Sequence, residues 1–399
     1  MLIALTPFFG INEVCTFLQI PSPLPILFYK IPKDVLLIFL LLLTTINIFQ
    51  KGIPHSSGIA LLVLFSFTII TFIFSSVNFL TSIAGLRWSL PIFLALTTIR
   101  LVDLPFLKRV SKILAIILVI NLLTQVYEMF NMPAIRGLNQ FGLSGRVSGF
   151  YSNASIAGVF ACLVLFFIKY FSNFTKRIKV LLYLVSFASI FLSMSSTAIG
   201  LLFVQMFAPM FLRSSYKVAI SIVFIPISLF ILFNLDFLTG RKSGSSDQSF
   251  STRVQIFAEQ FENVEVMSTR FGEATNTAVN FNKNNFANQD AYISDSLFTS
   301  VLTNYGAAFF LCFMVLILSM VPKIIRSDSE SLIVFFIICI LSSIPLIVTE
   351  IFPVSIMMVC LISYYSSGNY QTKKIKKVYP NNSRFQIADR YRSSVGTIS

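Results

Sequence analysis

Long apolar runs separated by short polar stretches make up most of this chain. Of its 399 residues, 56% are hydrophobic and only 12% are charged, whereas soluble domains carry about 25% charged residues. A helix that crosses a bilayer needs about 20 mostly apolar residues. About twelve runs meet that requirement: 2–20, 34–50, 58–76, 80–98, 110–129, 153–171, 179–195, 196–212, 218–235, 297–320, 331–348 and 350–366. The sequence therefore predicts an all-α, polytopic membrane helix bundle of about twelve transmembrane helices over residues 1–369.

Three of these runs need comment. The first is interrupted by Glu13, and it lacks both a basic leading segment and a small-residue cleavage site, so we expect a retained span rather than a cleaved signal. The pairs 179–195/196–212 and 331–348/350–366 are each one long apolar stretch. We expect each pair to fold back through a very short turn.

The net charge of +14 could suggest a nucleic-acid partner, but the basic residues fall in short clusters between apolar runs. That distribution is typical of the positive-inside rule and predicts no nucleic acid partner. If the twelve runs alternate in direction, 20 of the 30 basic residues fall on one side, which we assign to the cytoplasm together with both termini. These cytoplasmic residues are Lys51, Arg100, Lys108, Arg109, Lys112, Lys169, Lys176, Arg177, Lys179, Arg213, Lys217, Lys323, Arg326, Lys373, Lys374, Lys376, Lys377, Arg384, Arg390 and Arg392.

Two longer polar segments fall on the external side in this topology. The first functional loop is 130–152, and the second is 236–296, a 61-residue insertion with eight of the sixteen acidic residues. A long loop in a tight bundle is usually functional or disordered. The basic, Asn/Ser-rich tail 370–399 is interpreted as a disordered cytoplasmic segment that skims the membrane.

The sequence excludes several kinds of chemistry. It has no phosphate-binding P-loop, no GxGxxG after a strand and no HExxH, and its one histidine, His55, falls in a predicted cytoplasmic loop. Histidine base catalysis and a histidine-ligated metal are therefore not expected. The five cysteines lie inside apolar runs without metal-binding spacing, so we interpret them as packing residues and predict no disulfide. We predict no metal and no cofactor, and a substrate that is already activated.

The stretch "GRVSGFYSNASIAG", residues 145–158, places an arginine among small polar residues just before an apolar run. Arginine binds phosphate through a planar fork and stays charged. The small residues Gly145, Ser148 and Gly149 would let backbone approach a ligand, and Ser152 or Asn153 could cap the next helix, whose N-terminus favours anions. Arg146 is therefore a candidate phosphate ligand. The alternative is an ordinary loop-to-helix cap.

Further candidate charges lie in the large loop and in one span. In the loop, Arg253 and Arg270 alternate with carboxylates that include Glu273, and Asp295 precedes a helix start. Arg87 lies about one-third of the way into the run 80–98, where a charge is costly and suggests function. The alternatives are that its side chain extends to the membrane surface or that it forms a structural pair, for example with Glu13. An external face with several arginines suits an anionic, lipid-linked substrate.

Three stretches resemble the O-antigen polymerase family, within the O-antigen polymerase and ligase superfamily. "GRVSGFYSNASIAGVFACLVL" is similar to its arginine–glycine–aromatic–asparagine segment that opens a helix. "STRVQIFAEQFE" with the later "STRFGEATN" resembles its large-loop pattern of an arginine, an amphipathic helix and a glycine turn, here Arg253 and Gly272. "DSLFTSVLTNYGAAFFLCFMVLIL" resembles the segment in which Asp-Ser enters a helix and Tyr-Gly follows, here Tyr305 and Gly306.

This resemblance implies a GT-C-like glycosyltransferase of the bacterial inner membrane. Such an enzyme transfers a growing glycan from undecaprenyl pyrophosphate to the next lipid-linked oligosaccharide unit at the periplasmic face, which serves lipopolysaccharide or another surface polysaccharide. Arg146, Arg253, Arg270 and Arg87 would bind the pyrophosphate and stabilise it as it leaves. Asp295 and Glu273 would be the catalytic carboxylates that position or deprotonate the acceptor. The resemblance also implies a chain-length regulator and a flippase as partners.

Two departures from the family pattern affect the choice between its branches. Residues 153–155 read Asn-Ala-Ser, so the usual Pro-Asn of the first motif is absent, as is its second glycine. The large loop contains no histidine, although the ligase branch typically has one as its proposed base, and this favours the polymerase. The alternatives are an O-antigen ligase and a polysaccharide flippase or other transporter. Flippases usually have two related halves and short loops, whereas this chain has one long insertion and no evident repeat.

Overall fold

The structure is a computed structural model of the chain. It describes residues 2–11, 15, 26–99, 101–135, 147–151, 153–213, 258, 261–262, 264–274, 296–326, 329–343, 346, 348 and 351–367. Within these ranges every regular element is a helix, so the all-α prediction is confirmed for this part of the chain. The predicted run 218–235 and the tail 370–399 lie outside it.

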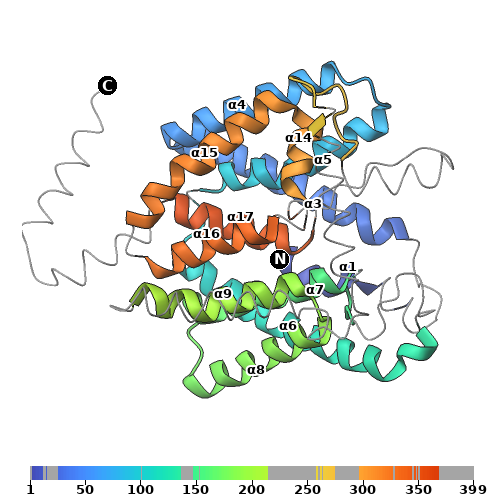
Figure 1. The fold of residues 1–399 in the computed structure, drawn as a ribbon, viewed down its shortest axis with the longest axis vertical. Coiled ribbons are helices and arrows are strands. Elements are labelled where there is room, and N and C mark those ends of the chain that lie inside the picture. Colours follow the sequence, from blue (N-terminus) through green and yellow to red (C-terminus); the bar gives the residue numbers. More distant parts are fainter. Residues whose placement is uncertain are drawn as a thin grey trace, which may run out of the picture.

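Most apolar runs fold as the helices that were expected from them (Figure 1). The elements are η1 (Leu2–Leu5), α1 (Thr6–Phe9), α3 (Ile26–Lys51), α4 (His55–Ile73), α5 (Phe79–Thr97), α6 (Leu104–Ile135), α7 (Ala154–Phe171), α8 (Lys176–Ser193), α9 (Ser196–Arg213), α14 (Leu297–Tyr305), α15 (Ala307–Arg326), α16 (Glu330–Ser343) and α17 (Val354–Ser366). Four of them, α3, α5, α6 and α7, are long and apolar enough to cross a membrane, and five others are shorter apolar helices.

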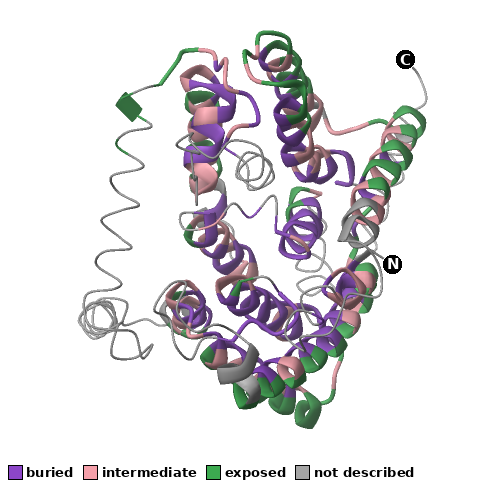
Figure 2. Cartoon of the chain, turned by 90° about the vertical axis from the view of Figure 1, so that its right-hand side faces the viewer, coloured by how far each residue is buried: buried purple, intermediate pink, exposed green. Residues whose placement is uncertain are grey.

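The helices form two neighbouring groups. In one, α7 packs against α6, α8 and α9, and α9 packs against α16; in the other, α5 packs against α3 and α4, and α14 contacts α4 and α15. Helix α17 contacts both α5 and α7 and so joins the groups. Figure 2 shows buried residues where helices face one another and exposed residues along the outer helices. Many of the exposed side chains are large and apolar, particularly on α3, α4 and α15, as expected of helices that face lipid.

Helix α7 is the most enclosed of the four long helices, with 78% of its length buried. A Cβ at Gly158 would lie 2.5 Å from the Ser193 hydroxyl and 2.6 Å from the Ala198 Cβ. Glycine therefore allows α7 to approach the α8–α9 turn closely, as small residues do between membrane helices. That turn is only two residues long, with Met194 in the left-handed region at φ 44°, which confirms the prediction of a very short turn there.

Three expected boundaries are wrong. Helix α6 continues to Ile135, so the first external loop begins later than residue 130. The run 297–320 is two helices, because α14 ends at Gly306 and α15 begins at the next residue. Helices α16 and α17 are separated by residues 344–353 rather than by a very short turn. Pro353 directly precedes α17, and proline disfavours helix at the residue before it.

Candidate functional site

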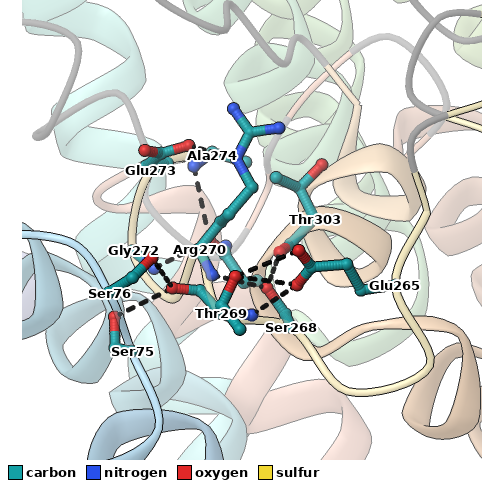
Figure 3. Close-up of polar contacts among 11 residues, drawn as sticks. Ser75, Ser76, Glu265, Ser268, Thr269, Arg270, Gly272, Glu273, Ala274 and Thr303 are labelled. Atoms are coloured by element: carbon teal, nitrogen blue, oxygen red, sulfur yellow. Dashed lines mark hydrogen bonds and ion pairs between the residues drawn. The ribbon is translucent and has the colours of Figure 1, made fainter.

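Residues 264–274, here called the strap, are the described part of the large polar insertion that carries candidate charges. The strap crosses between the α4–α5 turn and α14. At the turn, the Thr269 carbonyl accepts a hydrogen bond from the Ser76 N–H at 2.7 Å, and the Ser76 hydroxyl lies at 3.1 Å from the same oxygen. On the strap itself, the Glu265 carboxylate accepts the Thr269 N–H at 2.7 Å (Figure 3). The strap is thus fixed to the turn through its backbone.

The strap also packs closely on α5. Gly272 has φ +96°, and a Cβ there would lie 1.9 Å from the Thr81 carbonyl oxygen. A Cβ at Gly85 would lie 2.7 Å from the Phe271 ring. Phe271 is fully buried, and its ring lies 5.5 Å from that of Tyr305 at 71°. Glycine at 272, a residue of the second resemblance, is therefore required by both its backbone conformation and its distance from α5.

The strap joins the second and third stretches that carry the family resemblance. Gly306, at φ +86°, ends α14, and a Cβ there would lie 2.7 Å from the Val266 carbonyl oxygen. The first N–H groups of α15 bond to strap carbonyls, Ala307 to Glu265 at 2.9 Å and Ala308 to Val266 at 3.1 Å. These are helix N-terminal donors that have no partner within their own helix. The break at Gly306 lets the strap satisfy them.

Two of the candidate charges meet on the strap. Arg270 Nε lies 2.7 Å from Glu273 Oε2, and both side chains are somewhat more than a quarter exposed. Figure 3 shows the two side chains extending to the same side of the strap. One predicted anion ligand and one predicted acceptor base therefore form a partly solvated ion pair.

Arg87, the candidate charge within a span, has a structural partner. Its Nε donates to Asp34 Oδ1 at 3.0 Å, which joins α5 to α3. The partner considered from the sequence, Glu13, lies outside the described residues. Arg87 is two residues from Gly85, so the helix on which the strap packs also carries this arginine.

The described part of the first motif, residues 147–151, is bound to α6 by a buried carboxylate. Glu128 Oε2 accepts the N–H groups of Ser148 and Gly149, both at 2.8 Å, and Glu128 is fully buried. The amides that were expected to meet a ligand are therefore bonded to an internal carboxylate. Burial also raises the pKa of Tyr151 above its usual value, so this hydroxyl stays neutral.

Two buried amides on α6 extend this attachment. Gln125 Nε2 donates to the Val147 carbonyl at 3.4 Å, and Asn121 Oδ1 accepts the Phe150 N–H at 3.4 Å. A Cβ at Gly149 would lie only 2.3 Å from Asn121 Oδ1. Gly149 is therefore needed because its φ is +63° and side chains of α6 leave no room for a Cβ.

The structure brings only some of the predicted site residues together. Arg270 and Glu273 are adjacent, whereas Figure 1 shows the strap beside α4, α5 and α14 and the first motif beside α6, α7 and α8. Arg146, Arg253 and Asp295 lie outside the described residues and stay predictions. The expected helix cap is confirmed at Asn153, whose side chain accepts the Ser155 N–H at 2.8 Å.

Two residues that organise these segments received no role from the sequence. Neither Glu128 nor Asn304 was among the candidate residues. The signal for Glu128 was present: Asn121, Gln125 and Glu128 follow one another at helical spacing in an otherwise apolar run, which marks one polar helix face. The signal for Asn304 was a single amide directly before Tyr-Gly.

Within the described ranges, no group of three or more His, Cys, Asp or Glu side chains could hold a metal ion. No family model, curated protein or solved structure matches the chain.

Proposed function

We propose that this chain polymerises lipid-linked oligosaccharide repeat units into a surface polysaccharide. It would transfer the growing glycan from undecaprenyl pyrophosphate to the next lipid-linked unit, at the periplasmic face of a bacterial inner membrane. The observation that carries the proposal is the strap: it joins the large-loop stretch to the Tyr-Gly stretch and places Arg270 beside Glu273 at 2.7 Å. The twelve-span, GT-C-like architecture belongs to the same proposal.

The chemistry requires an anion ligand next to a carboxylate, and the strap supplies both. The departing pyrophosphate gains negative charge, and a fixed guanidinium can stabilise it without a metal. The acceptor sugar hydroxyl must lose its proton, for which Glu273 is the candidate base. In the absence of substrate the two groups neutralise each other. Pyrophosphate competes with Glu273 for the Arg270 guanidinium, so substrate binding weakens the ion pair and frees the Glu273 carboxylate to act as the base.

Substitution of the pair tests the proposal. Arg270→Ala and Glu273→Gln are expressed in a host whose own copy is deleted, and the length distribution of surface polysaccharide is read on a gel. Each change should lower polymer yield at least about tenfold at normal protein level. Arg270→Ala removes an oxyanion-type contact, worth about 10²–10³ in rate, and Glu273→Gln removes a general base, worth about 10²–10⁴. Glu262→Gln is the matched control, since Glu262 is an exposed carboxylate of the same insertion. Normal polymer from both site variants would exclude this site.

Deletion of the gene for this chain distinguishes a polymerase from a ligase or a flippase. Loss of a polymerase leaves a single repeat unit on the surface lipid, because ligation of unpolymerised units continues. Loss of an O-antigen ligase or of a flippase leaves none. A deletion strain without any repeat unit on its surface lipid would therefore contradict the polymerase.

A further inference from the structure

Asn304 on α14 binds the strap backbone on both sides of Glu273. Its Oδ1 accepts the Gly272 N–H at 3.0 Å and the Ala274 N–H at 3.3 Å, and the residue is fully buried. The Ala274 N–H belongs to the peptide unit after Glu273, so Asn304 fixes that unit directly, and through Gly272 it fixes the backbone one unit earlier. The unit between Gly272 and Glu273 is held by the Glu273 N–H, which donates to the Arg270 carbonyl at 3.1 Å. The direction in which the Glu273 side chain leaves the backbone therefore depends on Asn304.

The Nδ2 group of the Asn304 amide is also hydrogen-bonded. Asn304 Nδ2 donates to the Ser300 hydroxyl at 3.1 Å, and that hydroxyl donates to the Ala274 carbonyl at 2.6 Å. A rotation of the amide group would break both sets of contacts, so its orientation is determined. Buried polar networks of this kind specify one conformation when every member is satisfied.

We infer that Asn304 is a positioning residue for the Arg270–Glu273 pair. It holds the strap so that the carboxylate and the guanidinium lie side by side where the donor pyrophosphate and the acceptor hydroxyl meet. This inference rests on the proposed function. Asn304 acts only through the strap and reaches neither substrate, and a misplacement of about 1 Å by such a residue can cost about 100-fold in rate.

The first measurement follows the strap itself and is independent of activity. Ala274→Cys is introduced into a chain whose five native cysteines are replaced by alanine, and its reaction with a membrane-impermeant maleimide is timed. Ala274 is fully buried, so labelling should be slow. Asn304→Leu should speed it at least about tenfold, because the amides of Gly272 and Ala274 lose their acceptor. Unchanged labelling overturns the inference.

The second measurement asks whether Asn304 works through Glu273. Polymer yield is compared for Asn304→Leu, Glu273→Gln and the double variant, each normalised to folded protein. If Asn304 acts by placing Glu273, the double variant should be no worse than the more impaired single variant, since residues that act as a unit are not additive. A purely structural role predicts a further loss in the double variant, and that result overturns the inference.

Conservative and matched variants complete the test. Asn304→Asp keeps an oxygen acceptor for both amides and should retain more polymer than Asn304→Leu. Ser300→Ala removes the acceptor that orients the Asn304 amide together with the hydroxyl's own bond to the Ala274 carbonyl, and it serves if Asn304→Leu fails to fold. Gln205→Leu removes a buried amide that bonds to the Cys162 carbonyl at 2.7 Å within the α7–α9 interface, and it should leave strap labelling unchanged.

Failure of the proposed function is distinguishable from failure of the inference. If Arg270→Ala and Glu273→Gln both make normal polymer, the proposed site is wrong whatever the labelling shows. If those two variants lose polymer while Asn304→Leu changes neither labelling nor yield, the site stands and the role of Asn304 is overturned.

Discussion

Glu128 accepts two backbone N–H bonds from residues that lie about twenty positions further along the chain, and none of its surface is exposed. A carboxylate at such a depth is costly unless its oxygens are bonded. Here Oε2 accepts both bonds, from Ser148 and Gly149, which lie two and three residues after Arg146. Val147, the residue after Arg146, is fixed as well, since its N–H donates to the Leu192 carbonyl at 3.2 Å.

Replacement of Glu128 should therefore lower the stability of the folded protein. In Glu128→Ala the amides of Ser148 and Gly149 lose their acceptor, and each buried donor left unbonded costs about 1–3 kcal/mol. We expect a lower unfolding temperature in detergent. Glu128→Gln keeps one acceptor oxygen and should fall between the parent and Glu128→Ala. An unfolding temperature for Glu128→Ala equal to that of the parent would show that other groups hold this segment.

At the scale of helices, the break between α14 and α15 depends on a segment that precedes it by about forty residues. The strap supplies carbonyls to the first N–H groups of α15, and only glycine fits at position 306, where φ is +86° and the strap backbone is within 2.7 Å of a Cβ position. A continuous helix would leave no room for the strap.

Gly306→Ala should therefore destabilise the protein by about 1–3 kcal/mol, the usual cost of a residue in a strained backbone region. It should also release the strap, so that Ala274→Cys reacts faster with maleimide. Gly200→Ala is the matched control, since Gly200 lies within α9 and a Cβ there meets nothing within 4 Å. That control should be neutral or stabilising by up to about 1 kcal/mol. Equal unfolding temperatures for the two variants would contradict the role of Gly306.

The helices themselves could be predicted because each depends mainly on its own apolar run. The helix at Ala154 was predictable for the same local reason, since Asn153 is a typical cap. The break at Gly306 was not, because it is set by hydrogen bonds from the strap. The site was likewise predictable only in part. The sequence indicates Arg270 and Glu273 as candidate charges. Their 2.7 Å pairing and the role of Asn304 as a buried acceptor depend on how distant segments pack.

At the scale of the whole molecule, several contacts connect segments that the charge pattern assigns to the same side of the membrane. Four join external segments and one joins cytoplasmic segments. The external pairs are Ser76 with Thr269, Val147 with Leu192, Ser296 with Ser343 and Lys33 with Phe352, and the cytoplasmic pair is Tyr170 with Glu330. If successive helices cross the membrane in alternating directions, such contacts are required to join helix ends on the same side, since ends on opposite sides cannot meet. These contacts are the ones that the alternating arrangement requires, and the topology stays a prediction.

The direction of the thread can be measured with single cysteines in the cysteine-free chain. Ser76→Cys and Val264→Cys lie at exposed external positions in the proposed topology, and Gly52→Cys and Asn173→Cys lie at exposed cytoplasmic ones. With intact cells whose outer membrane admits the reagent, an impermeant maleimide should label the first two. The other two should react only after the inner membrane is permeabilised. The opposite pattern would place Arg270 of the strap on the cytoplasmic side, and it would thereby remove this arginine from any periplasmic transfer.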